Sequence, residues 1–207
     1  MSFECTSYLI FELVLCNLSS LADACIDVTV LSYEWQEFPQ RAIELLGGIH
    51  HVKSLTLWSN TLDVWNSLVR AFLPTFHNLT HLRIPWCWGL SDDSDQYTTE
   101  ALMHFLQKLL NLEYLEIPGE FDPESEWSSI VPQCIKFCLK TVRILHLKGS
   151  DTELIWLKYF LGNTNVLERV TILCSESLQA DSEKQKKINN EVQAIRKGLV
   201  SCVVEFL

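Results

Sequence analysis

The chain has 207 residues, of which 48% are hydrophobic and 20% charged, and its formal net charge is −10. This length and composition allow a sizeable buried core, in one domain or one repeat array, and argue against disorder. The acidic balance also argues against a nucleic-acid or anionic-membrane surface, because both need clustered Lys and Arg. We therefore expect no nucleic acid and no membrane among its partners.

Eight cysteines are spread through the sequence, mostly singly and inside apolar runs. That distribution favours buried, reduced thiols over a disulfide framework, and it predicts an intracellular protein, cytoplasmic or nuclear. The early apolar run YLIFELVLC is not predicted to be a signal sequence, since it has Glu4 before it and Glu12 within it and lacks a clear cleavage site. It is also too short to span a bilayer.

Short runs with the pattern L-x-x-L-x-L, or close to it, recur along the chain and predict strands. Their apolar positions are Ile10, Leu13 and Leu15; Cys25, Val28 and Val30; Val52, Leu55 and Leu57; Leu79, Leu82 and Ile84; Leu112, Leu115 and Ile117; Val142, Leu145 and Leu147; and Leu167, Val170 and Ile172. From the third run on, the starts at 52, 79, 112, 142 and 167 are 27, 33, 30 and 25 residues apart. These spacings are close to the period of leucine-rich solenoids. The terminal SCVVEFL is a candidate closing strand.

The stretches between these runs predict helices that cover one face of a parallel sheet. Pro39 suits the first position of a helix that should end at Gly47 and Gly48. Two further apolar stripes at helical spacing are Leu62, Trp65, Leu68, Val69 and Phe72, and then Leu102, Phe105, Leu106 and Leu109 after Thr98 or Thr99. A last helix should place Ile188, Val192, Ile195 and Leu199 on one face.

The most complete unit lies between residues 140 and 172. Ser150 and Glu153 are three apart, as in a capping box at a helix start. Leu154, Leu157 and Leu161 then share a helical face, and Gly162 stands where a helix often ends in a left-handed residue. The unit therefore predicts a right-handed strand, helix, strand crossover.

The sequence offers few groups for chemistry. Cys134 and Cys138 lack a second Cys or His pair at zinc-ligand spacing, and no nucleophile-elbow or phosphate-binding motif occurs. The acids Asp92, Asp93 and Asp95 lie in a loop without the glycine and closing glutamate of a calcium site. We expect no catalytic residue, no cofactor, no metal site and no enzyme activity.

What remains is a surface on the side of the sheet opposite the helices. The residues between the apolar positions should line it in rows, because side chains alternate along a strand. The residues predicted to bind a protein on this face are Trp58, His81, Arg83, Tyr114, Glu116 and His146. Its width, about 30 Å for seven strands, suits a peptide or a protein face.

The segment from Trp127 to Ile172, together with the terminal SCVVEFL, resembles the FBD domain at the C-terminal end of plant F-box/leucine-rich-repeat proteins. The upstream segments HHVKSLTLWSN, FHNLTHLRIPW and LLNLEYLEIPG resemble the repeats that precede that domain. The resemblance implies an α/β fold, a leucine-rich-repeat solenoid with a parallel β-sheet and outer helices, closed by an FBD-type C-terminal cap. Irregular leucine-rich repeats would occupy residues 1–126, and an FBD-like domain with a C-terminal helix and strand would occupy residues 127–207.

The implied function is a protein-interaction module, the substrate-recognition part of an F-box-type (SCF) ubiquitin ligase receptor. Nothing before Ser20 resembles an F-box, so the ligase adaptor is an expected partner only if an F-box is supplied upstream. The target protein is unknown from sequence. Two alternatives stay open: a degenerate or dominant-negative binding protein not linked to ubiquitination, and a small thiol-dependent enzyme, which would need a cysteine of depressed pKa.

Overall fold

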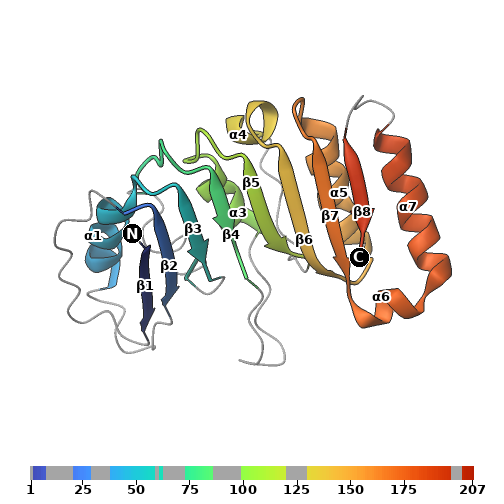
Figure 1. Cartoon of the computed structure of the whole chain (residues 1–207), viewed down its shortest axis with the longest axis horizontal. Helices are drawn as coiled ribbons and strands as arrows, with labels where there is room; N and C mark the ends of the chain where they lie inside the picture. Colours follow the sequence, from blue (N-terminus) through green and yellow to red (C-terminus); the bar gives the residue numbers. More distant parts are fainter. Residues whose placement is uncertain are drawn as a thin grey trace.

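A computed structural model of the chain describes residues 2–7, 21–28, 38–58, 61–62, 73–85, 99–119, 130–196 and 202–207. Within these ranges eight strands form one sheet, in which every strand is parallel to its neighbours and follows the order of the chain. Figure 1 shows the sheet running from β1 at one end to β8 at the other, with α3 and α5 behind it and α7 beyond β8. The protein is therefore an α/β protein with a parallel sheet, as the sequence predicted.

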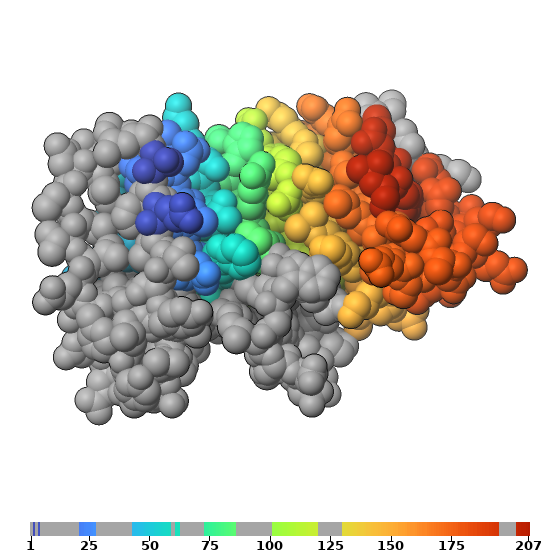
Figure 2. Space-filling view, turned by 60° about the horizontal axis from the view of Figure 1, so that its bottom comes forward, coloured from blue at the N-terminus to red at the C-terminus, as the bar shows by residue number. Residues whose placement is uncertain are grey.

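The strands are β1 (Ser2–Ser7), β2 (Asp23–Val28), β3 (Ser54–Leu57), β4 (His81–Arg83), β5 (Tyr114–Pro118), β6 (Thr141–Leu147), β7 (Arg169–Cys174) and β8 (Val203–Phe206). The described helices are α1 (Phe38–Ile49), α3 (Thr99–Leu106), α4 (Gln133–Phe137), α5 (Asp151–Asn163), α6 (Glu176–Ala180) and α7 (Ser182–Arg196). Figure 2 shows the described residues passing from blue through green and yellow to orange across the molecule, with the red C-terminal residues placed before its orange end.

One backbone contact recurs where each strand begins. The carbonyl of Lys53 accepts from the amides of Thr80 and His81, and the carbonyl of Thr80 accepts from the next pair, Glu113 and Tyr114. The same pattern continues from residue 113 to residues 140 and 141, and from residue 140 to residues 168 and 169. Successive units therefore stack with one geometry, and the equivalent positions 53, 80, 113, 140 and 168 give the true spacing of the repeat.

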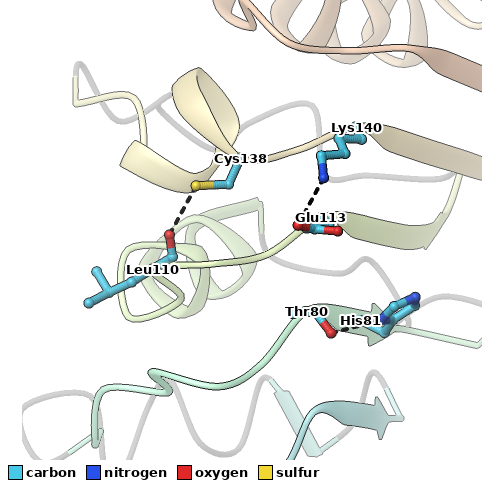
Figure 3. A network of polar contacts seen from close by, with 6 residues as sticks. All are labelled: Thr80, His81, Leu110, Glu113, Cys138 and Lys140. Atoms are coloured by element: carbon cyan, nitrogen blue, oxygen red, sulfur yellow. Dashed lines mark hydrogen bonds and ion pairs between the residues drawn. The ribbon is translucent and has the colours of Figure 1, made fainter.

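A side-chain ladder runs beside this backbone contact. Asn78 Nδ2 donates to the carbonyl of His51 at 3.3 Å, and Asn111 Nδ2 donates to that of His77 at 2.7 Å. One unit later Cys138 Sγ donates to the carbonyl of Leu110 at 3.2 Å, which Figure 3 shows beside the Lys140–Glu113 contact. A thiol thus replaces the asparagine amide at the same position of the repeat.

The core lies between the sheet and the helices. The apolar positions predicted for β3, β4, β5 and β7 are all buried: Val52, Leu55, Leu57, Leu79, Leu82, Ile84, Leu112, Leu115, Ile117, Leu167, Val170 and Ile172. Leu102, Phe105, Leu106 and Leu109 are buried as predicted, and so are Ile188 and Val192 of α7. Ile10, Leu13, Leu15, Val30 and the apolar stripe beyond Leu62 lie outside the described residues.

The predicted register of β6 is wrong. Leu139, Val142 and Ile144 are buried, whereas Leu145 is only half-buried. The pairing of β6 with β7 shifts between Ile144 and Leu147, where His146 adopts a positive φ of 56°. This bulge adds a residue to β6, so Leu147 returns to the core although Ile144 also faces it.

The pattern predicted for β2 is also wrong, because it begins four residues too late. Ala24 and Ile26 are buried, and Cys25 is half-buried on the other face. The inward set is therefore Leu21, Ala24 and Ile26. The small side chain of Ala24 concealed this set, because a search for large apolar residues prefers Cys25 and Val28.

The helix ends differ in how well local sequence predicted them. The capping box is confirmed: Ser150 Oγ accepts from the Glu153 amide at 3.3 Å, and Glu153 Oε2 accepts from the Ser150 amide at 2.7 Å. Gly162 does not end α5, which continues to Asn163 and stops at an extended Thr164. Gly47 and Gly48 likewise lie inside α1, which ends at Ile49.

Candidate functional site

The outer face is the side of the sheet opposite the helices, and its side chains form rows set by the strand register. One row contains Asp23, Ser54, His81, Tyr114, Thr141, Arg169 and Val203, and the next contains Cys25, Thr56, Arg83, Glu116, Arg143, Thr171 and Glu205. His81 and Arg83 are exposed, and Tyr114, Glu116 and Arg143 are half-buried. These five residues, from β4, β5 and β6, form the Tyr114 cluster.

Tyr114 holds the cluster together. Its ring stacks on His81, with centroids 5.5 Å apart and an interplanar angle of 24°, and the Arg83 guanidinium carbon lies 5.8 Å from its centroid. Its hydroxyl donates to Glu116 Oε2 at 2.8 Å. Burial raises the pKa of the Tyr114 hydroxyl, and the bond to Glu116 and the charge of Glu116 raise it further, so the phenol stays a donor. The ring is therefore fixed at both its edge and its face.

Glu116 joins the aromatic part of the cluster to Arg143. Arg143 Nη1 lies 3.3 Å from Glu116 Oε2, and the Glu116 side chain is only 13% exposed. Among the described residues, Arg143 Nε is buried without a hydrogen-bond partner. His81 Nδ1 lies 2.9 Å from Thr80 Oγ1, a contact drawn in Figure 3. Most polar groups of the cluster are thus positioned by contacts within the face.

The structure brings together four of the six residues predicted for the binding face: His81, Arg83, Tyr114 and Glu116. Trp58 follows β3 and acts on Cys25 of β2, whose thiol pKa it lowers against the larger effect of burial. His146 was expected in the central row, but Arg143 occupies that place between Glu116 and Thr171. His146 lies at the bulge of β6, so the wrong register of that strand is the cause of this error.

Arg143 is the site residue that sequence reasoning missed. A signal was present one residue before the first buried leucine of three successive strand runs, where Asn78, Asn111 and Cys138 make the ladder described above. Alignment on these three polar positions, rather than on the leucines alone, places Arg143 level with Glu116.

Three of the described cysteines are poorly suited to chemistry. Cys134 Sγ donates to the carbonyl of Leu106 at 3.3 Å, and burial raises the pKa of this thiol to about 12. Burial also raises the pKa of Cys25 and of Cys174, which disfavours the thiolate that a thiol enzyme needs.

Within the described ranges no three His, Cys, Asp or Glu side chains are grouped so that they could hold a metal ion. The acidic residues Asp92, Asp93 and Asp95 lie outside those ranges. None of the described helices is long and apolar enough to cross a membrane.

Comparison with known proteins identifies related sequences. The FBD family model matches residues 126–172. The chain is 29% identical to an F-box/FBD/LRR-repeat protein of Arabidopsis thaliana, over 96% of this chain and 43% of the relative. It is 28% identical to a second protein of that name, over 86% of this chain and 40% of the relative, and 24% identical to an F-box/LRR-repeat protein, over 98% and 45%. All three relatives come from the same plant.

The chain spans less than half the length of these curated relatives. No solved structure matches it significantly. The match to the FBD model begins one residue before the start at Trp127 proposed from sequence, and ends at the same Ile172. The chain thus contains a segment that matches the FBD family model, and over most of its length it is similar to plant F-box/FBD/LRR-repeat proteins, as its sequence predicted.

Proposed function

We propose that the chain is a protein-interaction module, in which leucine-rich repeats over residues 1–126 form a solenoid and an FBD-type cap over residues 127–207 closes it. The repeated backbone contact at each strand start and the chain-ordered parallel sheet support a solenoid, because stacked equivalent units produce both. The FBD match within the second part supports the cap.

The observation that carries this proposal is the Tyr114 cluster. Tyr and Arg are among the residue types that most often contribute large shares of binding energy at protein interfaces. Here Tyr114 is held by Glu116 and His81, so a partner would not have to immobilise its ring. A contact surface that is ordered before binding loses less conformational entropy when the complex forms.

Within the family, the implied role of such a face is substrate recognition for an SCF-type ubiquitin ligase. The relatives' names contain F-box, FBD and LRR together, which supports this role for the present chain. The ligase adaptor would then be engaged through an F-box supplied upstream of the repeats. The alternative role, binding without ubiquitination, uses the same face and differs only in what happens to the bound protein.

Affinity purification with quantitative mass spectrometry tests the binding face. The triple variant His81→Ala, Arg83→Ala, Tyr114→Ala should lose partners that the unmodified chain captures, since loss of one hot spot already lowers affinity about thirtyfold. The matched control carries Lys186→Ala, Lys187→Ala and Asn190→Ala, three exposed positions of α7. Melting curves of both variants should confirm that they fold.

Equal loss in both variants, or none in either, would refute the proposed face. To separate the two roles, a captured partner is co-expressed with the chain fused to an F-box. A ligase receptor should then increase ubiquitination of that partner, and the face variant should abolish the increase. Capture through the face with unchanged ubiquitination would favour the binding-only role.

A further inference from the structure

Charge is unevenly distributed over the outer face. On β1 and β2 the face carries three acids, Glu4, Asp23 and Asp27. None of them is ion-paired with any residue of the described ranges. Burial raises the pKa of the Cys25 thiol, and the negative charges of Glu4 and Asp27 raise it further. This end of the face is therefore negative and uncompensated.

Arg83 on β4 is the opposite case. Arg143 pairs with Glu116 and Arg169 pairs with Glu205 at 3.2 Å, but within the described part of the chain no carboxylate pairs with Arg83. Glu116 is its neighbour in the register, yet that carboxylate is already engaged by Tyr114 and Arg143. Arg83 therefore keeps an available guanidinium, whose one described contact is the Tyr114 ring.

The two charged regions lie at a defined spacing. Neighbouring strands lie about 4.8 Å apart, so β2 and β4 are separated by about 10 Å. The face of β3 between them presents the neutral Ser54 and Thr56. About 9 Å, close to this separation, is the span of three residues in a polyproline II peptide at about 3.1 Å per residue, and residues three apart lie on the same side of that helix.

We propose that the outer face binds a peptide segment of a partner protein that crosses the strands in the polyproline II conformation, with a carboxylate on Arg83 and a Lys or Arg three residues away against Glu4, Asp23 and Asp27. This inference rests on the proposed function and specifies the chemistry of its partner. Arg83 suits the carboxylate because a guanidinium offers two parallel N–H donors. The acidic end orients the segment, because a peptide laid in the reverse sense would place like charges together.

The experiment starts from a random dodecapeptide display library, selected on the immobilised full chain. We expect enrichment of sequences in which Asp or Glu stands three positions from Lys or Arg. An enriched peptide is then synthesised, and its Kd is measured by fluorescence anisotropy at 50 mM and 500 mM NaCl, concentrations chosen at roughly a tenfold ratio to vary screening.

Variants assign the two ends of the peptide. Arg83→Gln should raise the Kd about tenfold at low salt and less at high salt, because salt screens exposed charges. Arg169→Gln is the matched control, since Arg169 lies on the same face but is paired with Glu205. Asp23→Asn should weaken binding of the enriched peptide, but not binding of a peptide whose basic residue is replaced by Gln. A peptide with its two charges exchanged should bind least.

The outcomes separate this inference from the proposed function. Peptides that need Tyr114 but show no charge pattern, or for which Arg83→Gln equals Arg169→Gln, would disprove the charge assignment and leave the binding face standing. A failure to enrich any peptide would disprove the peptide inference and leave the proposed function to the affinity purification. Equal binding of the enriched peptides to the unmodified chain and to the triple variant His81→Ala, Arg83→Ala, Tyr114→Ala, together with unchanged partner capture by that variant, would refute both.

Discussion

The part of the sheet from β3 to β5 and the unit from β6 to β7 use polar groups in opposite ways. Strands β3, β4 and β5 have four, three and five residues, and the polar side chains of β4 and β5 lie on the outer face in the Tyr114 cluster. Strands β6 and β7 have seven and six residues, and beside them the buried Glu153 makes internal polar contacts. Short strands pair through few backbone hydrogen bonds, so the first part depends more on its buried leucines.

Glu153 stabilises the second unit by accepting hydrogen bonds from its backbone. Its side chain is 2% exposed and accepts from the amides of Lys148 and Ser150, at 2.9 and 2.7 Å. It also lies against Gly119 of the preceding unit, where an added Cβ would be 2.9 Å from Glu153 Oε1 and 3.0 Å from Leu147 Cα. One carboxylate therefore connects β5, β6 and α5. Polar groups thus stabilise the fold of the second unit, whereas in the first part of the sheet they lie on the outer face and are available to a partner.

The largest expected effect tests the register of β6. Ile144→Ala should lower the free energy of unfolding by about 2–5 kcal/mol, because it removes a buried aliphatic side chain from the core. Leu145→Ala, at the half-buried neighbour, should cost less than half as much. Urea denaturation of both variants measures the difference. A larger cost at Leu145 would restore the register predicted from sequence.

The next effect concerns the internal carboxylate. Glu153→Ala should destabilise the fold by about 2–3 kcal/mol, since it leaves the Lys148 and Ser150 amides without their acceptor and removes a helix cap. The control Asp151→Ala changes an exposed acid in the same first turn and should cost at most about 1 kcal/mol. Thermal melts compare the two. Similar losses would mean that Glu153 acts only through the helix dipole.

A glycine pair should give effects of opposite sign. Gly119→Ala should cost about 1–3 kcal/mol, because its Cβ has no room beside Glu153 and Leu147. Gly162→Ala should stabilise by about 0.5–1 kcal/mol, since Gly162 lies inside α5 with no atom within 4 Å of its Cβ position. Chemical denaturation measures both changes. Destabilisation by Gly162→Ala would show that α5 ends at this glycine after all.

The smallest expected effect is on the outer face. Arg83→Gln should change the free energy of unfolding by no more than about 0.5 kcal/mol, because an exposed arginine without an ion pair in the described structure contributes little to folding. The same variant should weaken peptide binding, as argued above. A clear loss of stability would assign Arg83 to the fold and remove the contrast between the two parts of the sheet.

Local sequence determined much of this protein. The inward positions of β3, β4, β5 and β7 were predicted correctly because, in each run, the residue between the last two inward positions is polar: Thr56, Arg83, Glu116 and Thr171. The Ser150–Glu153 capping box was predictable because both partners lie within one helical turn. The same alternation predicted the position of four residues of the candidate face. The recurrence of strand and helix patterns predicted the chain-ordered parallel sheet.

Only the tertiary structure decided the remainder. In β6, Ile144, Leu145 and Leu147 are all apolar, so alternation alone allows two registers. Stacking on β5 selects Ile144, which pairs with Ile117, and the bulge that follows returns Leu147 to the core. With this register Arg143, rather than His146, lies beside Glu116. Arg143 and Glu116 are in contact although they are 27 positions apart in the chain. The physical reason is that a strand takes its register from the neighbour on which it stacks, and no pattern within the strand contains that neighbour.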